Sequence, residues 1–243
     1  MAEAWVWPAG LGLLGLLLGS FIATVAIRWP EGRSVARGRS ECDACGRVLG
    51  PGELVPVLSY VAQRGKCRGC AAPIAASHPV IEVLGLAMGL AAGFAAPGWT
   101  GAAGAVFGWL LLTLAALDLR AFWLPNSLTG ALAVAGLAIG FGPFAERLIG
   151  GLAGFAALWL VAAGYRRMRG REGLGGGDPK FFGAIGCWLG WQALPLVLLI
   201  ACGIGLAAVL ALRVAGNRMS GADRLAFGAL LAPAAFVIWL AMV

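Results

Sequence analysis

Long runs of apolar residues, separated by short polar segments, follow one another along most of the chain. Eight runs are long enough to cross a bilayer as helices, or nearly so, because about 20 apolar residues span its hydrocarbon core. They cover residues 5–27, 79–96, 101–117, 126–143, 147–164, 181–192, 194–214 and 227–242. The sixth run is short and rich in glycine, so the count becomes seven if 181–214 forms one bent element. The pattern predicts an all-α polytopic membrane protein with about eight transmembrane helices.

Composition agrees with this pattern and excludes an ordinary soluble domain. Of the 243 residues, 60% are hydrophobic and 12% are charged, whereas a soluble domain carries about 25% charged residues. No basic segment precedes the first apolar run, so we expect a retained span and not a cleaved signal peptide. We therefore divide the chain into a first transmembrane helix (1–27), a soluble segment (28–78) and a membrane core (79–243).

The basic residues predict the orientation of the chain, because Lys and Arg are enriched in cytoplasmic loops. If the eight runs alternate across the bilayer, only Arg147 falls on the opposite side from the other basic residues. The remaining seventeen are Arg28, Arg33, Arg37, Arg39, Arg47, Arg64, Lys66, Arg68, Arg120, Arg166, Arg167, Arg169, Arg171, Lys180, Arg213, Arg218 and Arg224. We expect that side to be the cytoplasm. The net charge of +7 is then a topology signal, and no basic motif typical of nucleic-acid binding accompanies it.

Four cysteines in the soluble segment have the spacing of a zinc site. "CDACG" and "CRGC" place Cys42, Cys45, Cys67 and Cys70 in two C-x2-C pairs separated by 21 residues. Four thiolates in two such pairs can bind Zn²⁺ tetrahedrally, and a closed set of four ligands indicates a structural metal. Gly46 and Gly69 suit the tight turns around a metal. The segment is too small to fold on an apolar core alone, so zinc would supply the missing free energy.

Two disulfides are the alternative for these cysteines, but a cytoplasmic segment keeps its thiols reduced, which favours zinc. Cys187 and Cys202 lie in apolar runs and are interpreted as small buried hydrophobic residues.

Two aspartates stand at the ends of apolar runs, where a charge is costly and therefore a functional candidate. Asp118 ends the third run and Asp178 begins the sixth, so alternation of the runs places both at the same membrane face. Two carboxylates that share a site also share a proton, which allows one to activate water while the other protonates a peptide carbonyl. Glycines at 173, 175, 176 and 177 would let a substrate backbone approach Asp178.

The residue types and positions of the acids also allow other interpretations. Asp178 followed by proline is also a good helix cap, and Asp118 could pair with Arg120 or Lys180. Glu82 is interpreted as compensating the dipole at the start of its helix. The single histidine excludes an H-E-x-x-H metalloprotease site, and no G-x-S-x-G motif is present.

Taken in order, several motifs resemble the type IV prepilin peptidases, membrane aspartyl proteases of the G-x-G-D kind. They are "LLLGSFIATVAIRWPEGRS", the two-cysteine-pair segment with "PVLSY", "LDLRAFWLPNSLT", "GREGLGGGDPKFFGAIGCWLGW" and "FGALLAPAAF". The resemblance covers nearly the whole chain and aligns Asp118 and Asp178 with the two catalytic aspartates of the family. It also implies supporting roles for Gly175, Gly176, Gly177 and Lys180.

The resemblance implies a bifunctional enzyme of the bacterial inner membrane. Family members remove the short basic leader of type IV prepilins and pseudopilins at the cytoplasmic face, and many then methylate the new N-terminus with S-adenosylmethionine. The cysteine segment goes with the second activity. Recognition of a basic leader would come either from packing of the substrate's transmembrane helix against the enzyme or from local acids, for which the candidates are Glu31, Glu41, Asp43 and Glu53. The expected partners are prepilins or pseudopilins and the lipid bilayer.

Three rival functions differ in class. A transporter would suit intramembrane acids, but here they lie at one face and no inverted repeat is visible. A non-enzymatic assembly protein docking through the cysteine segment leaves the acids and glycines without a role. A peptidase without methyltransferase activity is the third, because no glycine-rich nucleotide fingerprint supports an S-adenosylmethionine site.

Overall fold

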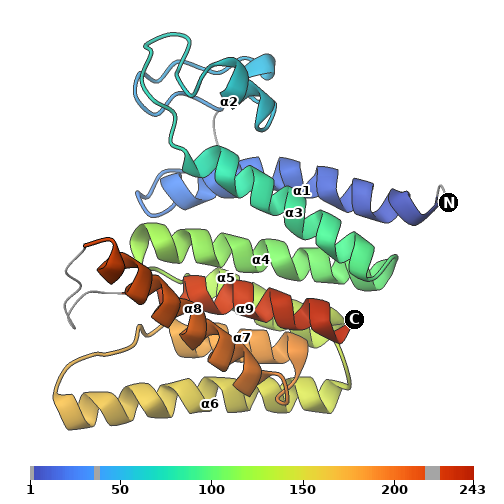
Figure 1. The fold of residues 1–243 in the computed structure, drawn as a ribbon, viewed down its shortest axis with the longest axis vertical. Coiled ribbons are helices and arrows are strands. Elements are labelled where there is room, and N and C mark those ends of the chain that lie inside the picture. Colours follow the sequence, from blue (N-terminus) through green and yellow to red (C-terminus); the bar gives the residue numbers. More distant parts are fainter. Residues whose placement is uncertain (1–2, 36–38, 217–224) are drawn as a thin grey trace. The chain divides into compact units, whose positions relative to one another are not determined.

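A computed structural model describes residues 3–35, 39–216 and 225–243, and helices make up almost all of their regular structure (Figure 1). Two isolated antiparallel bridges are the β-structure in these ranges. Arg37, Arg218 and Arg224, which the charge argument counts, lie outside the described residues. The chain divides into two compact units, Met1–Ala116 and Leu117–Val243.

Each of the eight apolar runs forms its own helix, which confirms the prediction of an all-α polytopic membrane protein. The helices are α1 (Glu3–Arg28), α3 (Ser77–Ala95), α4 (Trp99–Ala121), α5 (Asn126–Ile139), α6 (Phe144–Arg169), α7 (Asp178–Leu189), α8 (Leu194–Val214) and α9 (Phe227–Met242). Among the described residues, α1, α3, α4, α6 and α8 are long and apolar enough to cross a membrane, and α5 and α9 are shorter apolar helices. Residues 181–214 are not one bent helix, because Gly190 at φ 78° separates α7 from α8.

In the first unit, α1 and α3 pack side by side through facing glycines (Figure 1). A Cβ on Gly15 would overlap the carbonyl oxygen of Gly85, and a Cβ on Gly89 would overlap that of Leu11. Because lipid offers no hydrophobic drive for helix association, such close backbone contact is how membrane helices gain packing energy. Trp109 of α4 closes this layer by donating from Nε1 to the Gly85 carbonyl at 3.1 Å.

The soluble segment between α1 and α3 contains little regular structure. It includes a short 3₁₀ helix, η1 (Pro51–Glu53), and the five-residue helix α2 (Leu58–Ala62). Arg47 donates to Oε1 of Glu53, and the Gly50 amide donates to Oε2 of the same carboxylate at 2.9 Å. These bonds lower the pKa of Glu53, with the Arg47 bond as the first cause. Polar contacts thus replace an apolar core in this segment.

In the second unit, α7 is the central element and packs against α5, α6, α8 and α9. All of its residues except Lys180 are buried. Gly150 of α6 and Gly186 of α7 meet so closely that a Cβ on either would overlap the other's carbonyl oxygen. The twelve residues of α7 rise about 18 Å, which is less than the thickness of a hydrocarbon core, about 30 Å. Because of its burial and close packing, the glycine-rich sixth run forms the centre of its unit.

Candidate active site and metal centre

Asp118 lies near the C-terminal end of α4 and is held by the first turn of α9. Its side chain is buried, with the residue 5% exposed, and Oδ2 accepts a hydrogen bond from the Ala229 amide at 3.0 Å. The first amides of a helix have no partner within that helix, so they are available to a carboxylate from elsewhere. The α9 N-terminus thus binds Asp118 across 111 positions of sequence.

Asp178 is the first residue of α7 and is 6% exposed. Its Oδ2 accepts a hydrogen bond from the amide of Gly175 at 3.0 Å. A capping side chain would stand one residue earlier, at Gly177, and would accept from amides inside the helix. The observed bond runs backwards into the glycine loop, so helix capping does not account for Asp178.

The two carboxylates approach each other around Leu124 and the α9 N-terminus. A Cβ on Gly228 would lie 3.0 Å from Oδ2 of Asp118 and 3.1 Å from Cδ1 of Leu124. A Cβ on Gly177, next to Asp178, would lie 2.8 Å from Cβ of the same leucine. The Gly228 amide interacts with both carboxylates, and their charges are within electrostatic range of each other. The second unit therefore brings together the two acids that the sequence singled out.

A groove of about 300 Å³ lies beside Asp178, between α6 and the glycine loop. Its lining residues are Phe155, Trp159, Ala162, Ala163, Arg166, Glu172, Gly173, Leu174, Gly175, Gly176, Pro179 and Lys180. A Cβ on Gly176 would meet no atom within 4 Å, so this glycine borders open space. Lys180 donates from Nζ to Oδ1 of Asn126, the first residue of α5, at 2.8 Å. Three of the four predicted supporting residues, Gly175, Gly176 and Lys180, thus line one groove, and Gly177 packs on Leu124.

The four cysteines of the soluble segment meet at one point. Their sulfur atoms all lie within 4.8 Å of one another, and all four thiols are free. Sγ of Cys42 and Sγ of Cys70 are 3.9 Å apart. Tetrahedral zinc with Zn–S bonds of 2.3 Å needs sulfur atoms about 3.8 Å apart, whereas a disulfide needs about 2.05 Å. The four residues fit a metal ion, and the disulfide alternative does not describe this arrangement.

The electrostatics around these sulfurs also favour a cation. Hydrogen bonds from the Cys70 and Gly69 amides lower the pKa of Cys67 to about 6. The pKa of Cys70 is raised to about 11: the Ala72 amide lowers it, but the neighbouring sulfurs, Cys45 first among them, outweigh that effect. Four crowded thiols resist simultaneous ionisation, and a bound cation removes that resistance.

Comparison with known protein families matches two successive parts of the chain. Residues 13–95 match the bacterial Peptidase A24 N-terminal domain, and residues 105–210 match the type IV leader peptidase family. The chain belongs to the type IV leader peptidase family. No solved structure gives a significant match to it.

Curated relatives of this family cover most of the chain. A protein named prepilin leader peptidase/N-methyltransferase from Burkholderia pseudomallei is 40% identical, over 93% of this chain and 84% of its own length. Proteins with the same name are 35% identical in Aeromonas hydrophila (83% and 79% covered) and 32% identical in Neisseria gonorrhoeae (94% and 88% covered).

The two cysteine pairs of this leader peptidase family member form near-identical turns. Cys42 accepts from the Gly46 amide and Cys67 from the Ala71 amide, in each case through its carbonyl oxygen at 2.9 Å. Gly46 has φ 69°, as expected for a tight turn. In the second turn the left-handed residue is Ala71, at φ 57°, and not Gly69. Gly69 instead donates its amide to Sγ of Cys67 at 3.4 Å.

Glu82 has a different environment from the one its sequence position suggested. It is buried in α3, and its Oε2 accepts a hydrogen bond from the Val57 amide at 2.7 Å. This bond ties the soluble segment to the membrane helix. Sequence reasoning attributed Glu82 to the helix dipole because nothing local in the sequence connects positions 57 and 82.

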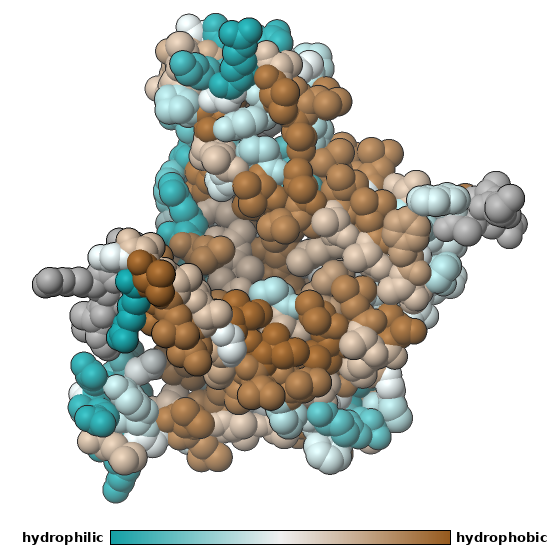
Figure 2. Space-filling model, in the orientation of Figure 1, coloured by the Kyte–Doolittle hydropathy of each residue, from teal (hydrophilic) through white to brown (hydrophobic). Residues whose placement is uncertain are grey.

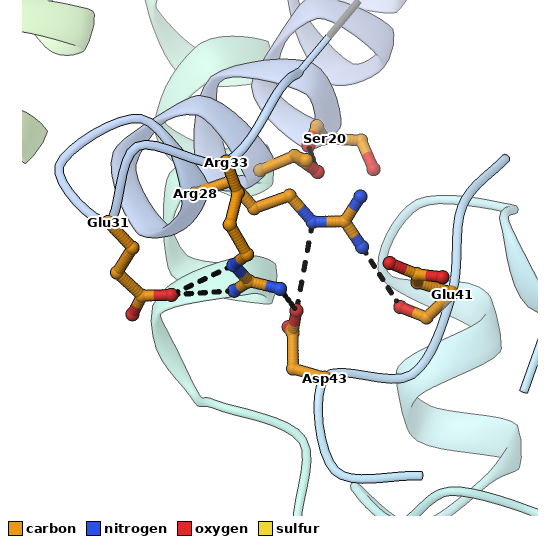
Figure 3. Close-up of polar contacts among 7 residues, drawn as sticks. Ser20, Arg28, Glu31, Arg33, Glu41 and Asp43 are labelled. Carbon is orange, nitrogen blue, oxygen red and sulfur yellow. Dashed lines mark hydrogen bonds and ion pairs between the residues drawn. The ribbon is translucent and has the colours of Figure 1, made fainter. Parts of the chain in front are cut away.

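Three of the four acids proposed to attract a basic leader, Glu31, Asp43 and Glu53, already have arginine partners in this family member. Arg33 contacts Glu31 at 2.8 Å and Asp43 at 2.9 Å, and Nε of Arg28 lies 3.7 Å from the same Asp43 oxygen (Figure 3). Arg28 also donates to the backbone carbonyl of Glu41 at 3.2 Å. These contacts hold the segment to the end of α1.

Leu124 and the α9 N-terminus are the parts of the site that sequence reasoning missed. The Ala229 amide reaches Asp118, and Leu124 packs beside Gly177 and Gly228, only through the tertiary fold. A glycine at the second position of a helix that follows a polar segment is the one sequence signal that could have pointed to Gly228.

Proposed function

We propose that the chain is a membrane aspartic endopeptidase that removes the basic leader from type IV prepilins and pseudopilins and then N-methylates the new N-terminus. One observation carries the peptidase proposal: Asp118 and Asp178, the two buried aspartates of the second unit, are held by backbone amides around a single leucine, beside an open groove. Membership of the leader peptidase family supplies the substrate class.

The two aspartates act as an acid–base pair. Two adjacent carboxylates cannot both ionise cheaply, so the pair holds one proton between them. The ionised member removes a proton from a water molecule, which attacks the scissile carbonyl, while the protonated member donates its proton to the carbonyl oxygen. The tetrahedral intermediate then collapses as the leaving amine takes up a proton. This reaction uses neither a metal ion nor a covalent enzyme intermediate.

The glycine loop and the groove provide access for the substrate. Gly175 and Gly176 line the groove immediately before Asp178, and a side chain at Gly176 would project into open space. We assign the substrate backbone to that space, because a peptide must lie within hydrogen-bond reach of the carboxylates for proton transfer. Gly177 seats the loop on Leu124, and Lys180, bonded to Asn126, fixes the start of α7 against α5.

The cysteine segment holds a structural zinc ion in this proposal. Cys42, Cys45, Cys67 and Cys70 are the four ligands, and a closed set leaves no position for water. The ion supplies folding free energy to a segment that lacks an apolar core. We place this segment (28–78), which lies between the first transmembrane helix (1–27) and the peptidase core (79–243), on the cytoplasmic side. We place both aspartates, which belong to the peptidase core, on the same side of the membrane. S-adenosylmethionine supplies the methyl group.

One reaction separates this function from its alternatives. The full-length protein in bilayer nanodiscs is incubated with a model prepilin and S-adenosylmethionine labelled in its methyl group, and both products are measured in the same tube. Cleavage after the leader together with label on the new N-terminal amine is the expected result. Cleavage without label leaves a peptidase alone, and absence of both products from a folded protein overturns the proposal in favour of a non-enzymatic membrane role.

A further inference from the structure

Four exposed apolar side chains lie on α2 and the residues just before it in the soluble segment. Leu54 is 43% exposed, Val55 42%, Leu58 69% and Val61 67%; we call these four residues the apolar rim. Leu58 and Val61 are three positions apart on α2 and so share one face of that helix. A cluster of exposed apolar side chains in an otherwise polar segment marks an interaction surface.

The rim is tied to the beginning of a membrane helix. Val57, in the middle of the rim, donates its amide to buried Glu82 of α3 at 2.7 Å. Val57 has φ 60° and ψ −52°, a conformation that β-branched residues rarely adopt, so tertiary contacts must hold it there. Glu82 is the sixth residue of α3, about 7.5 Å along the helix from its first residue. The rim therefore lies level with the first turns of α3.

The apolar surface continues from the rim onto α3. This helix is long and apolar enough to cross a membrane, and Val80, Val83 and Leu84 near its start are exposed on its surface. Figure 2 shows apolar side chains on the soluble segment of the first unit that lead into the apolar surface of the helices below it. The lipid-facing surface of α3 and the rim are thus neighbours at the membrane boundary.

Basic residues follow the rim along the chain. Arg64, Lys66 and Arg68 are exposed and come directly after α2. Exposed apolar side chains next to basic residues are typical of elements that lie in the lipid headgroup region, where the apolar groups enter the acyl boundary and the cations meet anionic headgroups. This charge pattern favours a lipid surface over another protein as the partner of the rim.

We propose that the apolar rim inserts into the headgroup–acyl boundary of an anionic lipid surface at the N-terminal end of α3. Insertion of Leu58 and Val61 fixes the four-cysteine segment against the membrane, in addition to the bond between Val57 and Glu82 and the contacts of Arg28 at the end of α1. Because insertion concerns only the contact with the membrane surface, it does not depend on the peptidase or methyltransferase activity.

Photo-crosslinking tests the contact directly. The photoreactive residue p-benzoylphenylalanine replaces Leu58 in the full chain, in nanodiscs of phosphatidylglycerol and phosphatidylcholine, and products are identified by mass. Val48, 43% exposed on the first cysteine turn, is the matched control position. We expect phospholipid adducts at position 58 well above those at position 48. Equal lipid labelling at both positions, or crosslinks from position 58 to residues 117–243 or to a second protein chain, overturns the proposal.

A variant that introduces charge into the rim gives a second, independent readout. Leu58→Glu combined with Val61→Glu places two acids in the rim, whereas Val48→Glu places one acid outside it. Zinc content, measured in every sample, shows that the segment is folded. In the same nanodiscs we expect trypsin to cut after Arg64 several-fold faster in the double variant than in wild type or Val48→Glu. Equal cutting rates in the three zinc-loaded proteins contradict insertion of the rim.

Discussion

At the scale of single residues, we expect cleavage activity to be most sensitive, outside the aspartates, to substitution of the glycines beside the two carboxylates. A Cβ on Gly175 would lie 2.9 Å from Oδ2 of Asp178, and one on Gly228 would lie 3.0 Å from Oδ2 of Asp118. Displacing a catalytic group by about 1 Å can cost about 100-fold in rate. We expect Gly175→Ala and Gly228→Ala each to lower kcat for prepilin cleavage by on the order of 10- to 100-fold, measured with purified protein.

Two further glycines refine that experiment. A Cβ on Gly203 of α8 would meet no atom within 4 Å, so Gly203→Ala is the control and should cleave like wild type. Gly176→Ala also meets no protein atom but faces the groove, so we expect it to raise KM and to leave kcat nearly unchanged. Wild-type kinetics for Gly176→Ala would exclude the substrate backbone from this space.

The sequence identified the two aspartates because a charge at the end of an apolar run is costly wherever the chain folds. It did not identify Leu124 or the Ala229 amide. Leu124 is one apolar residue among many, and an amide has no sequence signature at all. Their roles arise from the packing of α9 against the loop after α4, which no local pattern encodes.

At the scale of elements, the α1–α3 pair depends on backbone contact between glycines. A methyl group at Gly15 would overlap the Gly85 carbonyl, whereas one at Gly10 of the same helix would meet no atom within 4 Å. Overpacking of this kind costs about 1–3 kcal/mol. We expect Gly15→Ala to lower the thermal unfolding midpoint in detergent and Gly10→Ala to leave it unchanged. Equal midpoints would mean that the two helices do not pack this closely.

The cysteine segment offers a matched pair of cysteine substitutions. Cys45→Ser removes one of four sulfurs that meet at a point. Cys202→Ser changes a cysteine of α8 that is exposed, so the interpretation of Cys202 as a buried residue was wrong, whereas Cys187 is buried as expected. We expect wild type and Cys202→Ser to carry one zinc ion per chain and Cys45→Ser to lose it, by elemental analysis. We also expect Cys45→Ser to harm methylation at least as much as cleavage. Full zinc content in Cys45→Ser would remove the segment's role as a metal site.

Hydropathy predicted the helices well, because the need to satisfy every backbone group in lipid makes apolar runs helical. It did not predict that α7 is the buried centre of its unit. The glycines that made this run ambiguous are the ones that let α7 pack against α6, and burial of eleven of its twelve residues is a property of the assembled unit. Likewise, the spacing of the cysteines predicted that four thiols meet where a metal ion could bind, whereas the bond from Val57 to Glu82 had no local signal.

At the scale of the whole molecule, the basic residues predict which side of the membrane each loop occupies. Arg166, Arg167 and Arg169 end α6, and only Arg147 lies near its beginning. Cytoplasmic ends of membrane helices carry the excess of Lys and Arg. We expect reporter fusions after Gly170 to be active in the cytoplasm and fusions after Gly142 to be active in the periplasm. The reverse pattern would place the glycine loop, and with it Asp178, on the periplasmic side.

The pairing of Asp118 with Asp178 is the central claim, and cleavage of a model prepilin by amide variants tests it most directly. Purified wild type, Asp118→Asn, Asp178→Asn and the control Glu172→Gln, which alters an exposed groove-lining acid, are compared at equal concentration in nanodiscs. Each also receives pre-cleaved pilin and labelled S-adenosylmethionine. We expect both Asn variants to lose cleavage while still methylating pre-cleaved pilin, and Glu172→Gln to retain both reactions. Normal cleavage by either Asn variant would contradict the account, because one carboxylate of the pair would then be dispensable.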